Sequence, residues 1–183
     1  TTINNPLHGG AILSIATMGE HIDVINYLLK NGAIASQGVI SVILKGNIEI
    51  LEKLFEYGAT AHDGYSEDLV ALLVNAAIPA NDPTYCKSSN SETKEDLSNY
   101  VETLKFLLEH GDNPNAEFLE RGTVILIALS ALMDEPKNDT YKAICKLLIK
   151  HKADTSKVKS YTETIIKLKE EIIKDMKVVD KSD

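Results

Sequence analysis

The sequence predicts an all-α protein, a solenoid of stacked helix pairs that ends in a capping helix. A helix-ending phrase recurs four times along the chain. Segments between the phrases, such as 39–44 and 124–132, are apolar nearly all round, as helices packed between neighbours are. Residues 160–179 carry the amphipathic pattern of one more helix. Recurrence at intervals of a few tens of residues is typical of repeat proteins, so we expect a single domain over residues 1–183.

The recurring phrase is an apolar helix end, two polar residues and then a glycine. Its four copies lie at 27–33, 53–59, 106–112 and 147–154. A glycine at this position can adopt the left-handed conformation that closes a helix. The phrase therefore predicts helix ends just before Gly32, Gly58, Gly111 and, in place of a glycine, Lys152.

The residues upstream of these positions resemble the second helix of the ankyrin repeat family, which reads approximately G-H-x-E-I-V-K-L-L-L-x-x-G-A-D. Residues 46–51 read Gly-Asn-Ile-Glu-Ile-Leu before Gly58, and residues 112–115 read Asp-Asn-Pro-Asn after Gly111. The family's first-helix motif, T-P-L-H-x-A-A, is poorly kept. The chain is therefore similar to an array of degenerate ankyrin repeats with loop insertions.

The resemblance implies about four repeats, over 11–36, 37–63, 64–116 and 117–156. An ankyrin repeat has about 33 residues, whereas the intervals between the helix ends are 26, 53 and 41 residues. First helices at 39–45, 68–76 and 123–132 place every deviation in a loop, where insertions cost little. The largest insertion separates the two helices of the third repeat at 77–99, and a smaller one lies at 133–140.

A capping helix is predicted over residues 160–179. Ser160 and Glu163 form a capping-box pattern. Apolar residues then recur at helical spacing: Ile165, Leu168, Ile172, Met176 and Val179. Such a helix would shield the open end of the stack. A short dimerising coil is the alternative, and it is disfavoured by Asp175 and by the limited length.

Composition and motifs argue against catalysis and against a metal or cofactor. Cys86, in the insertion, and Cys145, on an apolar helix face, are too few for a disulfide framework or a zinc site. They suggest a reducing compartment. The five histidines form no ligand pattern, and no phosphate-binding loop, nucleophile elbow or zinc-protease motif occurs. We therefore expect no enzymatic activity, no cofactor and no metal.

Charge and hydropathy argue against nucleic acid and membrane as partners. The net charge is −8, and one Arg stands among 19 basic residues, whereas nucleic-acid binders concentrate Arg on a basic face. No apolar run is long enough to span a bilayer, and no secretory leader is recognised, so we expect a cytoplasmic protein. Lys142, Lys146 and Lys150 form a stripe on one helix face, either a solvated face or a docking patch for an acidic partner.

The resemblance implies a monomeric module that recognises another protein. In the ankyrin family the partner usually meets the finger loops between repeats and the inner helices. Phe118 and Arg121, with Leu119 between them, are the expected anchors on the finger at 117–121, because large aromatic and Arg side chains dominate interface energetics. The inner-helix positions expected to contact the partner are Thr17, Met18, Leu44, Lys45, Val74, Asn75, Ser130 and Ala131.

Three settings for such a module are compatible with the sequence. It could be an adaptor or scaffold that binds a folded partner or peptide. It could be a pathogen effector that acts on a host protein, in which case its location is the host cytoplasm. It could also be a targeting module cut from a larger enzyme.

Overall fold

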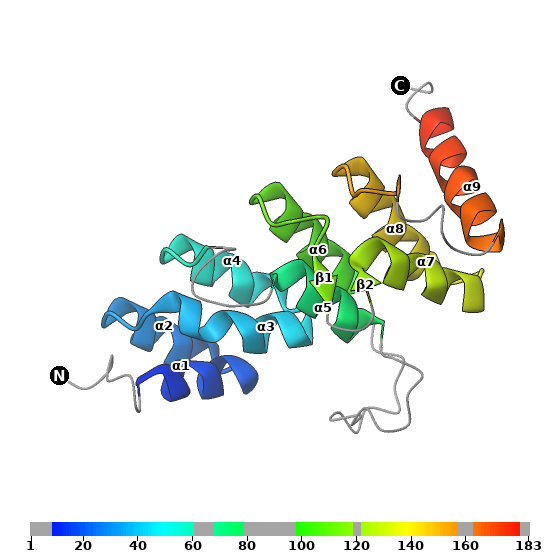
Figure 1. The fold of residues 1–183 in the computed structure, drawn as a ribbon. Helices are drawn as coiled ribbons and strands as arrows, with labels where there is room; N and C mark the ends of the chain where they lie inside the picture. The colour runs from blue at the N-terminus through cyan, green and yellow to red at the C-terminus, as the bar shows by residue number, and fades with distance from the viewer. Residues whose placement is uncertain (1–8, 61–67, 79–97, 119–121, 157–162, 180–183) are drawn as a thin grey trace.

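The computed structural model describes residues 9–60, 68–78, 98–118, 122–156 and 163–179, and these residues are mostly helical (Figure 1). The first helices of the pairs are α1 (Gly9–Met18), α3 (Val39–Lys45), α5 (Leu69–Ala77) and α7 (Val124–Asp134). The second helices are α2 (Ile22–Lys30), α4 (Ile48–Glu56), α6 (Ser98–Glu109) and α8 (Asp139–Lys150). The predicted all-α class is confirmed.

The helix pairs stack in two layers along the length of the molecule (Figure 1). In the inner layer α1 contacts α3, α3 contacts α5, and α5 contacts α7. In the outer layer α4 contacts α6, and α6 contacts α8. A short 3-10 helix, η2 (Ala35–Gly38), links the first two pairs and contacts α1, α3 and α4. The ribbon of β1 (Glu117–Phe118) and β2 (Gly122–Thr123) forms the finger before α7.

The recurring phrase ends each second helix in the left-handed conformation, as the sequence predicts. The backbone φ is 86° at Gly32, 90° at Gly58 and 88° at Gly111. Lys152 adopts the same conformation with φ at 67°, although it has a side chain. One position in the repeat therefore demands one backbone geometry, whichever residue occupies it.

Each of these ends is closed by the same two hydrogen bonds. The Gly58 N–H donates to the Phe55 carbonyl at 3.0 Å, and the Ala59 N–H donates to the Leu54 carbonyl at 3.0 Å. The equivalent bonds close the helices that precede Gly32, Gly111 and Lys152. This is the Schellman arrangement, which satisfies carbonyls that the helix end would otherwise leave unpaired.

The second helices of the last two repeats begin one turn earlier than those of the first two. Helices α6 and α8 have 12 residues each, whereas α2 and α4 have nine. The extra turn of α6 carries Tyr100, whose hydroxyl donates to the Leu44 carbonyl at 3.0 Å. This bond ties the third repeat to the second.

The helix boundaries differ from the expected ones mainly in the loops. Helix α5 reaches Ala77 and α6 begins at Ser98, so the expected insertion at 77–99 is shortened at both ends. Residues 79–97, which include Cys86, lie outside the described residues. The insertion expected at 133–140 is shortened to residues 135–138, because α7 continues to Asp134 and α8 starts at Asp139.

The last helix, α9 (Glu163–Val179), covers the end of the stack, as expected of a capping helix. It contacts both α7 and α8, and Figure 1 shows it beyond the last helix pair. Ile165 and Ile172 are buried in this contact. Ser160 of the expected capping box lies outside the part of the chain that the structure describes. Among the described helices, none is both long and apolar enough to cross a membrane.

Candidate partner-binding surface

The inner helices place the expected contact residues at very different depths. Met18 and Leu44 are exposed, and so is Lys45, which lies 3.7 Å from the Glu20 carboxylate. Ser130 and Ala131 are half-buried. Thr17, Val74 and Asn75 are buried, so their side chains are not available to a partner in this structure. Burial of Thr17, Val74 and Asn75 contradicts their expected role as contact residues.

Thr17 is buried because it takes part in the contact between the first two repeats. Its hydroxyl bonds to the carbonyls of Leu13 at 3.0 Å and Ser14 at 2.9 Å, and it lies 2.9 Å from the Ser41 hydroxyl on α3. Two small polar side chains thus allow α1 and α3 to approach closely while their hydroxyls stay paired. Sequence spacing places Thr17 on an inner helix, but it does not reveal which side of that helix meets its neighbour.

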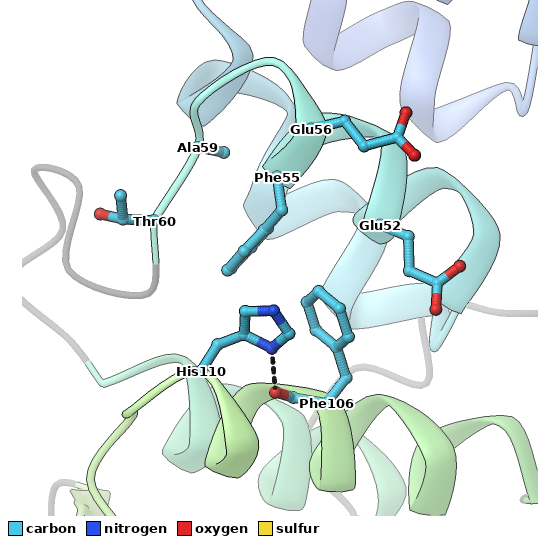
Figure 2. Close-up of a pocket in the computed structure, with 7 residues that line it drawn as sticks. All are labelled: Glu52, Phe55, Glu56, Ala59, Thr60, Phe106 and His110. Atoms are coloured by element: carbon cyan, nitrogen blue, oxygen red, sulfur yellow. Dashed lines mark hydrogen bonds between the residues drawn. The ribbon is translucent and has the colours of Figure 1, made fainter.

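An aromatic hollow of about 590 Å³ between α4 and α6 was not expected from the sequence. The rings of Phe55 and Phe106 meet edge to face with centroids 4.9 Å apart, and His110 stacks on Phe106 at 3.9 Å. His110 Nδ1 also lies 2.8 Å from the Phe106 carbonyl oxygen. Figure 2 shows the three side chains facing one another. The i, i+4 pairing of Phe106 with His110 is the only signal that sequence offered for this site.

Two carboxylates give the hollow an acidic side. Glu52 and Glu56 are exposed on α4, one turn apart, and both line the hollow, although in Figure 2 their side chains extend away from Phe55 and His110. Aromatic faces and carboxylates both attract cations. The hollow is therefore suited to the ammonium or guanidinium group of a basic side chain.

The residues that the structure describes include no cluster of metal ligands, and their cysteine, Cys145, is buried. Within the ranges that the structure describes, no group of three or more His, Cys, Asp or Glu side chains could hold a metal ion. Burial raises the pKa of the Cys145 thiol to about 12. A thiol with that pKa stays protonated at neutral pH and is a poor nucleophile.

Comparison with known proteins relates the chain to a named protein. No protein-family model matches it. A protein of Rickettsia bellii (strain RML369-C), provisionally named an ankyrin repeat protein, is 94% identical to the chain over 183 residues. This match includes the four helix ends described above. The chain is similar to this ankyrin repeat protein along its whole length, and its fold is an ankyrin-like helical repeat array. It is matched over 100% of its own length but spans only 50% of the relative.

The finger between the third and fourth repeats is only partly described. Phe118 pairs with Gly122 in the two-stranded ribbon, and β1 contacts α5. The Phe118 side chain is half-buried and packs against the hydrophobic core, so it does not project freely as the sequence suggested. Leu119 and Arg121 lie outside the described residues.

One lysine of the stripe on the last repeat forms an ion pair within the molecule. The Lys142 ammonium lies 2.9 Å from the Asp175 carboxylate of α9. This bond raises the pKa of Lys142 and lowers the pKa of Asp175. Lys142 therefore helps to hold the capping helix, and only Lys146 and Lys150 remain of the expected docking patch.

Proposed function

We propose that the chain is a protein-binding module with no catalysis of its own, and that its inner helices contact the partner. The observation that carries this proposal is the placement of Met18 and Leu44. Each lies 14 residues before the glycine that ends its repeat, so the two occupy equivalent places on neighbouring helices. Both are large apolar side chains exposed to solvent.

The surroundings of this pair suit a protein interface. The ion pair of Lys45 with Glu20 lies beside it, so apolar side chains are bordered by charge. Interfaces typically combine an apolar centre with a polar rim, and methionine is enriched in them. The expected roles of Ser130, Ala131 and Lys45 stay part of the proposal, whereas Thr17, Val74 and Asn75 contribute to packing between repeats.

We further propose that the aromatic hollow receives a basic side chain of the partner. Phe106 and His110 would form its floor, and Glu52 and Glu56 would pair with the charge. Glu52→Gln with Glu56→Gln should then weaken partner binding and reduce its dependence on salt. Normal binding by this variant would show that the hollow is not part of the interface.

The setting of the module is also a proposal. A relative twice as long supports a unit within a larger protein, and its source in Rickettsia bellii keeps an effector role open. The free, buried thiol of Cys145 fits a cytoplasm, either the cell's own or a host's. A translocation reporter fused to the protein separates these settings, because only an effector gives signal in the host cell.

The experiment is affinity purification with mass spectrometry, followed by calorimetric binding to the protein that is recovered. Met18→Ser with Leu44→Ser should weaken binding by about thirtyfold, since truncated anchors typically cost about 2 kcal/mol. The melting temperature should barely change because both side chains are exposed. Tyr57→Ser is the matched control, since Tyr57 is similarly exposed but lies at the end of α4. Equal binding by the double variant and the control would place recognition elsewhere.

A further inference from the structure

The first repeat exposes an apolar side chain at a position that is buried in every later repeat. Val24 lies eight residues before Gly32 and is 45% exposed. The residues eight positions before Gly58, Gly111 and Lys152 are 1%, 0% and 1% exposed, and they are Ile50, Thr103 and Ile144. These positions are equivalent in the repeat, and each of the later three has a preceding repeat beside it.

A second position on the same helix shows which neighbour is missing. Tyr27 is 64% exposed, whereas its equivalents Lys53, Phe106 and Leu147 are half-buried. In the third repeat this position is Phe106, and its ring contacts Phe55 on the second helix of the preceding repeat. Tyr27 therefore points to the place where a preceding repeat would lie.

Helix α1 presents apolar residues in the same direction. Ile15 is 66% exposed, while Ser41, the equivalent residue of α3, is 5% exposed and lies 2.9 Å from Thr17 of the preceding repeat. Ile12 is also exposed, and its equivalent Gly38 is buried. A Cβ at Gly38 would come within 2.9 Å of Thr17 Cγ2, so this position too faces the preceding repeat.

These residues form one surface, which we call the N-terminal face: Ile12, Ile15, Val24 and Tyr27. The other end of the stack is covered by α9. Exposed large hydrophobic side chains occur between positions 12 and 57, and none occurs in the described ranges from residue 68 to residue 177. The two ends of the array are thus unlike, one closed by a helix and the other apolar and open.

We propose that the N-terminal face docks a further ankyrin-type helix pair, supplied by the part of the polypeptide that precedes residue 1. The chain accounts for 50% of the Rickettsia bellii relative, which leaves room for several helix pairs at about 33 residues per repeat. The face offers the positions that join one repeat to the next elsewhere in this chain, so a helix pair of the same type fits it. The proposal rests on packing between repeats and is independent of the proposed partner binding.

A second copy of the chain is the competing occupant. Helix α9 blocks the far end of the stack, so copies cannot join head to tail through their repeats. Two N-terminal faces would have to meet each other instead. Such a pairing would make the 183-residue chain a dimer, which sedimentation detects.

The test compares the 183-residue chain with the full-length Rickettsia bellii relative by hydrogen exchange and thermal melting. We expect amides of α1 and α2 to exchange about tenfold more slowly in the full-length protein, and those of α8 to exchange equally in both. Ile15→Lys with Val24→Lys should lower the melting temperature of the full-length protein by about 4 °C or more. In the 183-residue chain the same change should shift it little, because both side chains are exposed there.

Tyr57→Lys is the control, since Tyr57 is exposed within an internal repeat and should behave alike in both proteins. Equal exchange of α1 and α2 in the two proteins would overturn the proposal. So would equal responses of both proteins to the double substitution. Sedimentation of the 183-residue chain as a dimer that the double substitution dissociates would assign the face to a second copy and would also overturn it.

Discussion

A single residue, Lys152, illustrates how the repeat constrains the backbone. The left-handed conformation brings a Cβ close to the following carbonyl oxygen and costs about 1–2 kcal/mol for an ordinary residue. Lys152 adopts this conformation despite the cost, because its N–H and the Ala153 N–H donate the two hydrogen bonds that close α8. The strain at this residue is offset by the hydrogen bonds and burial of the whole helix end.

Lys152→Gly should therefore stabilise the protein by about 1 kcal/mol, since glycine adopts this conformation without steric cost. Chemical denaturation of the variant measures the change. Gly58→Ala is the reverse substitution, and no atom beyond the glycine and its two chain neighbours lies within 4 Å of the added Cβ. It should destabilise by about 1 kcal/mol through backbone strain alone. If both substitutions lowered stability, the side chain of Lys152 would have to make a contact that outweighs the strain.

At the scale of helices, the start of α5 depends on a residue more than forty positions away. The Val70 N–H donates to Asp112 Oδ2 at 3.0 Å, although Asp68 stands at the N-cap position of the helix and makes no side-chain cap. Asp112 is buried and also accepts from the Asn113 N–H at 2.8 Å. The aspartate that follows one repeat's glycine thus caps the inner helix of that repeat.

Asp112→Ala should destabilise the protein by about 2 kcal/mol, because it removes a cap and leaves the buried Val70 N–H unpaired. Asp112→Asn keeps an oxygen acceptor in a side chain of the same shape, so it should lose less stability than Asp112→Ala. Asp68→Ala, at the nominal N-cap, is the control and should have a smaller effect. Thermal melts of the three variants rank them, and an Asp68 effect larger than the Asp112 effect would contradict this assignment.

The capping helix is attached by burial of its apolar face and by the pair of Lys142 with Asp175. The hydrogen bond to Lys142 lowers the pKa of Asp175. The stability that this carboxylate contributes is therefore present above the ordinary aspartate pKa and is lost as pH falls through the lowered value. The pKa of Lys142 is raised, mainly by the hydrogen bond to Asp175. The stability that the Lys142 ammonium contributes is present below the ordinary lysine pKa and is lost as pH rises through the raised value. The pair therefore acts between about pH 4 and pH 10.

Asp175→Asn should consequently speed amide exchange in α9 at pH 7, while leaving α3 and α4 unchanged. The effect should shrink at high salt, because both groups are exposed to solvent. Glu170→Gln is the control, since Glu170 is exposed on the same helix. Equal exchange of α9 in Asp175→Asn and wild type would show that burial of Ile165 and Ile172 alone holds the helix.

At the scale of the molecule, sequence predicts the features that each repeat determines locally. Gly32, Gly58 and Gly111 mark helix ends because the closing geometry depends on a few neighbouring residues. Burial of Thr17 and Val74 could not be predicted, since it depends on how adjacent repeats pack. The aromatic hollow escaped prediction for the same reason, because Phe55 and Phe106 are far apart in sequence and meet only when α4 and α6 stack.

An array of this kind should also respond unequally to damage at its end and in its middle. Each repeat contacts only its neighbours, so local opening spreads through the interfaces between repeats. Leu13 and Leu107 are both fully buried leucines. Leu13 lies on α1 at the end of the stack, whereas Leu107 lies on α6, which contacts α4, α5 and α8. Truncation of either side chain to alanine typically costs about 2–5 kcal/mol.

Leu13→Ala should therefore speed hydrogen exchange in α1 and α2 while α8 and α9 keep their protection. Leu107→Ala should speed exchange throughout the array and lower the single melting temperature, because both halves lose the interface that joins them. Hydrogen exchange resolved by peptide, with melts of both variants, makes the comparison. If Leu13→Ala deprotected α8 and α9 as strongly as α1, the molecule would unfold as one unit, and nearest-neighbour stacking would not describe its stability.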